Sequence, residues 1–331
     1  AQYDKDAEGI IYHTVKFCDY YHFRFKEMTE DKKMHVLKIE TDLTPQSSGQ
    51  LRTRFEAFAE ALGTKATGSR EENNMKYAAG IDIGSTSTDA VIMDDEMHIL
   101  GSAAVPTGRG AATGAEAALK IALNQAGITK EELGKIVTTG YGRDNTGIKG
   151  SSVTEITCHA KGAHFMDPDA RTIIDIGGQD SKAIKIDAEG NVVNFTMNDK
   201  CAAGTGRFLE MMARTLNMEL GEMVKTGLAW KKDINISSMC TVFAESEVVS
   251  LIADNTSTAD IIHGLNKAVA VKTAALARRI GGEEKYIMTG GVALNKGVAD
   301  ALSERLGSKV NIPPYPQLCG AIGAALIALG R

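Results

Sequence analysis

The stretch Ile81-Asp82-Ile83-Gly84-Ser85 decides the fold, because a near-copy, Ile174-Asp175-Ile176-Gly177-Gly178, follows later in the chain. Each copy is an apolar strand that carries an aspartate, then a glycine turn, small or polar residues and a further apolar strand. Such a strand–turn–strand unit can grip a phosphate group through its backbone N–H groups. Its duplication predicts two similar subdomains that face one cleft.

The rest of the chain from residue 77 alternates apolar runs with helical stretches, which is typical of an α/β fold. The predicted strands are Ala78–Ile83, Ala90–Met93, Ile136–Thr139, Thr172–Ile176, Ala183–Ile186, Ile234–Ile236 and Tyr286–Thr289. The predicted helices are Gly114–Gln125, Gly206–Leu216, Ser246–Ala253, Ile261–Ile280 and Gly297–Leu306. Both Asp-Ile-Gly turns therefore come at the end of a predicted strand.

The first turn has the chemistry of a phosphate and magnesium site. Gly84 lets the backbone turn tightly and approach an anion. A run of hydroxyl residues follows and supplies both O–H and backbone N–H donors. These residues are Ser85, Thr86, Ser87 and Thr88. Asp82 at the strand end is expected to hold Mg²⁺ through water, since Mg²⁺ keeps several waters and uses few carboxylates.

Two further segments complete a predicted nucleotide site. Gly177, Gly178 and Gln179 would cradle the opposite side of the phosphates, with Asp175 orienting the metal or the attacking water. The segment from Met288 to Asn295 is a strand that ends in Gly290-Gly291 before a helix, and a helix start suits the sugar and α-phosphate. Taken alone, each segment is no more than an ordinary turn. Their order and spacing together favour ATP binding.

Two cysteines suggest a metal cluster. Cys201 lies in Asn198–Phe208 and Cys240 in Ser238–Glu247, each at the predicted start of a helix. The N–H groups there favour a thiolate and can donate to the sulfurs of an iron–sulfur cluster. A cubane cluster normally takes four cysteines, so two chains related by a two-fold axis would complete the set. The alternative is that these cysteines are inert core, as most buried cysteines are.

Composition narrows the remaining possibilities. The chain has 331 residues, 43% of them hydrophobic and 24% charged, with a net charge of −5. The length predicts two domains, and the acidic balance argues against a nucleic-acid or membrane-surface partner. No bilayer-spanning run or secretion signal is visible, so we expect a cytoplasmic protein. Five scattered cysteines in such a chain do not indicate a disulfide framework.

The first 62 residues differ from the rest. Half of the aromatic residues lie before residue 77, and the polar, aperiodic stretch 63–76 is predicted to be a linker. Within residues 1–62 we expect strands at Gly9–Phe17 and Val36–Glu40, a turn at Cys18-Asp19 and a helix at Gly49–Leu62. These elements would form a small α/β appendage that buries little core of its own.

The three glycine segments resemble the phosphate-one, phosphate-two and adenosine motifs of the actin, sugar-kinase and heat-shock chaperone superfamily. This resemblance implies an α/β ATPase with two duplicated subdomains around a nucleotide cleft. One lobe would comprise about 77–170 plus the C-terminal end, the other 171–310. The sequence contains no P-loop, and Gly140-Tyr141-Gly142 lacks the third glycine of a dinucleotide fingerprint.

The cysteine segments, together with Thr139–Arg143, Glu155–Ala160 and Asp175–Asp180, closely resemble the activator component of 2-hydroxyacyl-CoA dehydratases. The same family includes the ATPase subunits of benzoyl-CoA reductase. The resemblance implies an oxygen-sensitive homodimeric ATPase of anaerobic metabolism with one 4Fe–4S cluster between the subunits. Such a protein takes one electron from ferredoxin or flavodoxin and passes it to a partner dehydratase or reductase, driven by ATP.

The same resemblance assigns residues to roles. Cys201 and Cys240 match the cluster ligands. The positions that match nucleotide contacts are Ser85, Thr86, Ser87, Thr88, Asp89, Gln179, Gly290, Gly291, Asn295 and Gln317. Asp89 departs from the family, which usually has lysine at that position, so a carboxylate stands near the expected phosphates.

Residues 8–60 are similar to the C-terminal end of a dehydratase subunit. The cysteine that matches Cys18 is a cluster ligand there, but the other ligands lie upstream and have no counterpart here. This resemblance implies a fused or read-through remnant, with a simple spacer as the alternative. Cys158 and Cys319 are expected to be core residues.

Two other functions stay open on the same fold. One is a small-molecule kinase of the sugar or acetate type, and the other is a non-redox nucleotide switch of the actin or chaperone type. The substrate of a partner enzyme is not specified by the sequence.

Overall fold

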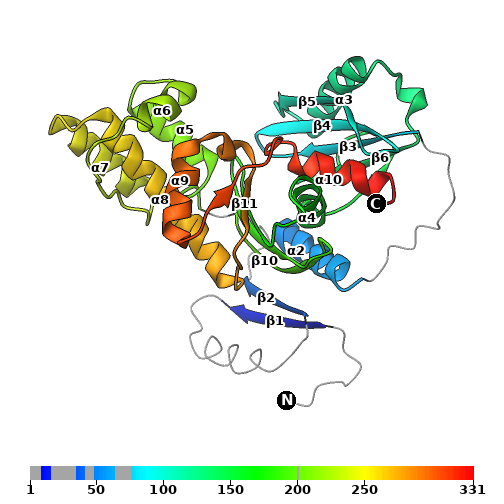
Figure 1. The fold of residues 1–331 in the computed structure, drawn as a ribbon, viewed down its shortest axis with the longest axis horizontal. Helices are drawn as coiled ribbons and strands as arrows, with labels where there is room; N and C mark the ends of the chain where they lie inside the picture. Colours follow the sequence, from blue (N-terminus) through cyan, green and yellow to red (C-terminus); the bar gives the residue numbers. More distant parts are fainter. Residues whose placement is uncertain (1–8, 16–34, 42–47, 64–75, 200) are drawn as a thin grey trace, which may run out of the picture.

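The computed structural model describes residues 9–15, 35–41, 48–63, 76–199 and 201–331. It contains two five-stranded sheets, each covered by helices, and a two-stranded sheet at the N-terminal side (Figure 1). Residues 64–75 of the predicted linker, and Cys18 with its predicted turn, lie outside the described residues. In the part of the chain that is described, no helix is long and apolar enough to cross a membrane.

The first sheet has the order β5-β4-β3-β6-β7. Its strands are β3 (Tyr77–Ile83), β4 (Ser87–Asp94), β5 (Ile99–Pro106), β6 (Lys135–Thr139) and β7 (Ser151–Ser152). The central strand β3 pairs antiparallel with β4 and parallel with β6. This register places Asp82 opposite Asp89 on one side and opposite Thr139 on the other.

The second sheet repeats this plan with the order β10-β9-β8-β11-β12. Its strands are β8 (Thr172–Ile176), β9 (Ser181–Ile186), β10 (Val192–Asn198), β11 (Tyr286–Thr289) and β12 (Val310–Asn311). Here β8 is central, and Asp175 stands opposite Lys182 of β9 and Thr289 of β11. The predicted duplication is therefore present in strand order, direction and register.

Helices cover both sheets (Figure 1). They are α3 (Ala111–Ala126), α4 (Glu155–Met166), α5 (Gly206–Thr215), α6 (Leu220–Gly227), α7 (Thr241–Ala253), α8 (Thr258–Arg279), α9 (Lys296–Leu306) and α10 (Cys319–Ala328), with short 3-10 turns η2 (Lys130–Glu132) and η3 (Gly291–Leu294). Helix α3 packs on the first sheet, whereas α8 and α9 pack together over the second.

The two sheets are joined through a close crossing of α4 and α10, which glycines make possible. A Cβ at Gly162 of α4 would lie 2.1 Å from the Cys319 carbonyl oxygen, and one at Gly323 of α10 would lie 1.8 Å from that of Cys158. Helix α10 also lies against β3, β4 and β6 of the first sheet, while α4 contacts β8, β9 and β10 of the second. The crossing is thus the joint between the lobes.

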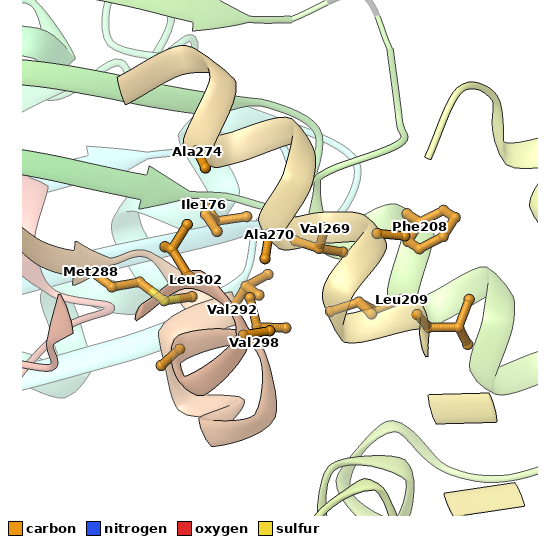
Figure 2. Close-up of a cluster of buried hydrophobic side chains, with 14 of the residues drawn as sticks. Ile176, Phe208, Leu209, Val269, Ala270, Ala274, Met288, Val292, Val298 and Leu302 are labelled. Carbon is orange, nitrogen blue, oxygen red and sulfur yellow. The ribbon is translucent and has the colours of Figure 1, made fainter. Parts of the chain in front are cut away.

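Figure 2 shows the core of the second lobe, where side chains of α5, α8, α9 and β11 meet. Phe208 and Leu209 of α5 are almost fully buried, 1% and 2% exposed, and belong to the same cluster as Val269 of α8 and Met288 of β11. This packing fixes α5 to the body of the second lobe.

The N-terminal appendage consists of β1 (Gly9–Val15) and β2 (His35–Thr41), which pair in parallel, and of α2 (Ser48–Ala61). Leu37, Ile39 and Phe58 form a small buried cluster, against which the partly buried Phe195 of the second sheet packs. The appendage therefore has little core of its own and completes it against the second sheet.

One predicted strand is wrong. Residues Ile234–Ile236 form no strand, and their side chains instead pack beneath α8, where both lie 3.1 Å from the position of a Cβ at Gly264. The alternation of apolar residues here reflects burial against a helix. Helix α7 begins at Thr241, five residues earlier than predicted, and α4 and α10 had not been predicted as helices.

Candidate functional site: a two-lobed nucleotide cleft

The two glycine turns have the same hydrogen-bond pattern and face each other. Gly84 N–H donates to the Ser87 carbonyl (2.9 Å), and Gly177 N–H donates to the Asp180 carbonyl (3.0 Å). A Cβ at Gly178 would lie 2.1 Å from Thr86 Oγ1, so the first and second loops touch directly. The cleft between the lobes is closed at this point, with Ser85, Thr86 and Gln179 exposed along it.

The two strand-end aspartates are linked by a histidine that was not among the predicted site residues. His159 of α4 places Nε2 3.6 Å from Asp82 Oδ2 and Nδ1 3.4 Å from Asp175 Oδ1. All three side chains are largely buried. Burial raises the pKa of the Asp82 carboxyl against the opposing charges of His159 and Lys182.

Asp175 differs from Asp82 because it has more partners. It accepts hydrogen bonds from Thr289 Oγ1 (2.8 Å) and Lys182 Nζ (3.2 Å). Burial alone would raise the pKa of Asp175, but His159 and Lys182 outweigh burial and lower it. Asp175 therefore stays a carboxylate, the form needed to orient a metal ion or a water molecule.

Lys182 of β9 is a buried cation inside a group of carboxylates. Its Nζ lies 2.6 Å from Asp180 Oδ2, and a further carboxylate, Glu155 Oε2, lies 3.3 Å away. Burial would lower the pKa of Lys182, but the carboxylates, Asp180 first, raise it well above its ordinary value. Burial raises the pKa of Glu155 to about 8.

Asp89, the residue that departs from the family pattern, lies inside this site. It is 5% exposed and accepts hydrogen bonds from Ser87 Oγ (3.1 Å) and Gln317 Nε2 (3.3 Å). Burial, helped by the neighbouring Asp82, raises its pKa to about 8. A neutral carboxyl near phosphates removes the repulsion that a carboxylate would cause.

In the predicted adenosine segment, Gly290 permits a tight turn and Asn295 caps a helix. Gly290 has φ 84°, and a Cβ there would lie 2.4 Å from the Ile176 carbonyl oxygen, whereas a Cβ at Gly291 would meet nothing within 4 Å. Asn295 is buried and caps α9 by accepting from Gly297 N–H (3.0 Å) and Val298 N–H (3.4 Å). Its amide also donates to Asn266 Oδ1 (3.1 Å).

The two cysteines of the predicted cluster occupy different positions. Cys240 is the N-cap residue of α7, as predicted. Cys201 is not at a helix start, because α5 begins at Gly206 with Thr205 as its N-cap. The intervening residues form a turn, in which Thr205 Oγ1 donates to the Ala202 carbonyl (2.8 Å).

Cys201 nevertheless lies five residues before Gly206, where α5 is hydrogen-bonded to the second glycine loop. The first N–H groups of α5 donate to the second glycine loop, Gly206 N–H to the Gly177 carbonyl and Arg207 N–H to the Gly178 carbonyl, both at 2.8 Å. A movement of that loop is therefore transmitted to the start of α5.

A cluster of exposed apolar side chains surrounds Cys240. Met239 is 73% exposed, Val242 65% and Phe243 59%, and the exposed Val249 and Ile252 follow on α7. Cys158 and Cys319 are fully buried, which agrees with the prediction that they are core residues, and burial raises the pKa of both thiols.

The duplicated sheets, the paired glycine loops and the closed cleft define a two-lobed nucleotide-binding protein. Its fold is shared with sugar kinases: a ROK family glucokinase from Streptomyces griseus, solved in complex with glucose and AMPPNP, superposes with a TM-score of 0.50 over 77% of this chain and 100% of that chain. The identity is 16%, so this likeness concerns the fold alone.

The chain belongs to the BadF/BadG/BcrA/BcrD ATPase family, whose model matches residues 79–328. The activator of lactoyl-CoA dehydratase from Anaerotignum propionicum is 48% identical over 252 residues, 76% of this chain and 97% of that protein. The 2-hydroxyisocaproyl-CoA dehydratase activator of Clostridioides difficile is 42% identical and covers 76% of this chain and 94% of its own. The expected family is confirmed.

The solved structure of that second activator, from Clostridium difficile with bound ADPNP, superposes with a TM-score of 0.74 over 77% of this chain and 94% of that chain. Residues 3–62 match a different family model, the D-component of 2-hydroxyglutaryl-CoA dehydratase. The resemblance of the appendage to a dehydratase subunit is thus also confirmed.

Proposed function

We propose that this chain is an ATP-driven, one-electron activator of a 2-hydroxyacyl-CoA dehydratase or a related reductase, acting in the cytoplasm. Ferredoxin or flavodoxin would be the electron donor. The proposal is supported by relatives named as dehydratase activators and by the family's ATPase character. The observation that carries it is the pair of hydrogen bonds from the start of α5 to the second glycine loop, five residues after Cys201.

The donor set supports a 4Fe–4S cluster held by Cys201 and Cys240 of two copies of the chain. In the described ranges, no group of three or more His, Cys, Asp or Glu side chains is placed to hold a metal ion. One chain thus offers only part of a cubane's four thiolates. Cys240 lies among exposed Met239, Val242 and Phe243, and a second copy would bury this apolar surface. The cluster would supply a one-electron carrier.

In the cleft, Asp82 and Asp175 would hold Mg²⁺ through water, and the two glycine loops would bind the phosphates of ATP. Asp175 has the lowered pKa that suits this task, while His159 and Lys182 keep its orientation fixed. Gln179 would orient the attacking water, and Gln317, Gly290 and Gly291 would border the nucleotide. Separation or closure of the loops would shift Gly206 and, through it, the segment that carries Cys201.

We further infer that residues 1–62 are a dehydratase-subunit-like unit attached through a linker at 63–76. The first lobe would comprise about 77–170 plus the C-terminal end, and the second 171–310. This division places one glycine loop and one strand-end aspartate in each lobe.

Anaerobic purification tests the proposal. The wild-type protein should be brown, form a dimer and contain about four irons per dimer. Cys201→Ser and Cys240→Ser should each lose the colour and the iron but still bind a fluorescent ATP analogue. Cys158→Ser is the matched control and should retain both. Colourless wild-type protein, or iron that survives both substitutions, would refute the cluster assignment, and phosphorylation of a sugar by such protein would favour a kinase.

A further inference from the structure

Helix α2 of the appendage is bound to the first lobe through a buried arginine. Glu56 Oε2 accepts from Arg143 Nη2 at 2.5 Å, and Arg143 is only 7% exposed. Arg143 also donates to the Gly140 carbonyl (3.2 Å), at the end of β6 beside Asp82. On the same side of α2, Arg52 lies 3.5 Å from Asp144.

A second contact of α2 is with the start of α4, the helix at the joint between the lobes. Glu60 accepts from Thr154 N–H (3.2 Å) and from Thr154 Oγ1 (2.5 Å), and the Thr157 hydroxyl donates to the same carboxylate. One carboxylate thus satisfies three donors in the first turn of α4. Negative charge at this position is also favoured by the dipole of that helix.

The third contact of α2 is with the second lobe. Arg54 Nη2 lies 3.4 Å from Asp199 Oδ1, and the Asp199 side chain is 4% exposed. Asp199 follows β10 and comes two residues before Cys201. Phe58 of α2 packs in the same area with Phe195 of β10.

We propose that α2 is a strap bound across both lobes, which holds the cleft closed and slows the entry and release of nucleotide. The lobes can move apart only if α2 leaves one of them, because its ion pairs reach Arg143 in one lobe and Asp199 in the other. In the strapped state the two glycine loops touch at Thr86 and Gly178, so nucleotide must part them.

The strap is an addition to a complete ATPase. The relatives from Anaerotignum and Clostridioides match 76% of this chain while being covered over 97% and 94% of their own lengths. The family model likewise begins at residue 79. The hydrogen bonds and ion pairs of α2 given above reach Arg143, Asp144, Thr154, Thr157 and Asp199, which lie outside the two glycine loops, so losing them leaves the phosphate-binding groups in place. Release of α2 is therefore expected to change the rates of nucleotide entry and release without abolishing nucleotide binding.

The test uses the full chain with Arg54→Ala and Glu60→Ala, alone and combined. Stopped-flow fluorescence with mant-ADP measures association and dissociation rates. Each single variant should raise both rates roughly fivefold or more, since each removes hydrogen bonds in which at least one partner is charged. The double variant should gain less than the product of the two effects, because both substitutions release the same helix. Glu116→Gln on the exposed face of α3 is the control and should leave the rates unchanged.

Hydrogen–deuterium exchange without nucleotide supplies an independent measurement. The variants should increase exchange in α2 and in both glycine loops, whereas Glu116→Gln should not. Unchanged rates and unchanged loop exchange in the double variant would overturn the strap. If wild-type protein did not bind mant-ADP, the proposed function would fail, and the exchange measurement would still decide whether α2 restrains the lobes.

Discussion

Gly140 and Gly290 are structural counterparts in the two lobes. Each follows a threonine at the end of the strand parallel to the central one, with φ of 85° and 84°. A Cβ at either position would lie 2.4 Å from a carbonyl oxygen, that of Ile83 or that of Ile176. The duplication seen in the Asp-Ile-Gly turns therefore extends to a second pair of turns. Each of these turns packs against the carboxyl group of the strand-end aspartate in its lobe.

This equivalence predicts that Gly140→Ala and Gly290→Ala have similar effects. Both combine a positive φ with a clash against backbone, and strain of this kind costs about 1–3 kcal/mol or more. Thermal unfolding should show a decrease in Tm of roughly 3 °C or more for each variant. Gly291→Ala is the neighbouring control, because nothing lies within 4 Å of its Cβ position, and its Tm should match the wild type. A neutral Gly140→Ala would contradict the equivalence.

Asp89 predicts a pH-dependent stability. Its pKa is raised to about 8 in the folded protein, whereas an unfolded chain loses this proton near pH 4. The stability that the neutral form contributes is therefore complete below about pH 4 and is lost progressively as the pH rises toward 8. Asp89→Asn imitates the neutral carboxyl and retains partners for Ser87 and Gln317.

The Tm advantage of Asp89→Asn over wild type should therefore grow by roughly 3 °C or more between pH 5 and pH 8 and then level off. Differential scanning fluorimetry at four pH values is sufficient for the measurement. A constant difference across this range would show that Asp89 is ionised in the folded protein throughout.

Lys182 and Lys185 on strand β9 provide a matched pair. Lys182 is buried among Asp175, Asp180 and Glu155, and removing its charge by Lys182→Met leaves these carboxylates uncompensated, at a cost of about 3–5 kcal/mol. Lys185 pairs with the exposed Glu283, so Lys185→Met should cost about 0–1 kcal/mol. Equal Tm values for the two variants would show that the buried charge of Lys182 contributes no more to stability than the exposed charge of Lys185.

Two substitutions of Asn295 can distinguish its structural role as the cap of α9 from its predicted contact with nucleotide. Asn295→Ala removes the cap of α9 and should cost about 0.5–2 kcal/mol, whereas Asn295→Asp keeps both acceptor bonds, loses only the donation to Asn266 Oδ1, and should be more stable than Asn295→Ala. Tm reports the cap, and titration with mant-ATP reports the predicted contact. If Asn295→Asp lost as much stability as Asn295→Ala, the cap could not be the source of the effect.

The parts of the fold that could be predicted were those with local signals. Asp82 and Asp175 were recognised because each sits in an apolar strand followed by glycine, and both strands exist. Helix α10 was missed because its glycines are normally unfavourable in helices, and only the crossing with α4 explains them. Ile234 and Ile236 alternate like a strand, but what they contact is the helix surface at Gly264.

In the site, too, residues in local motifs could be predicted, whereas residues brought together by tertiary contacts could not. The glycine loops come from contiguous motifs, whereas His159 and Lys182 acquire meaning only when α4 and β9 bring them to the aspartates. His159 has no local signal in the sequence, because its neighbour is Cys158 and adjacent residues of a helix do not face one another. The available signal for Lys182 was its place in a second apolar strand, directly after the strand that carries Asp175. Arg143 and Glu56 could not be paired from the sequence, since they lie 87 positions apart, with the predicted linker between them.

The crossing of α4 and α10 has a mechanical consequence. Helices that approach closely enough for Gly162 and Gly323 to touch the opposite backbone cannot slide past each other, because any side chain or shift along the axis meets a carbonyl oxygen. The contact itself does not oppose a rotation of the two helices about the point where they meet, a motion that α2 restrains while it is bound to both lobes. The crossing therefore acts as a fulcrum, and small angular changes near it become larger displacements at the far end of the second lobe, where α7, capped by Cys240, lies (Figure 1).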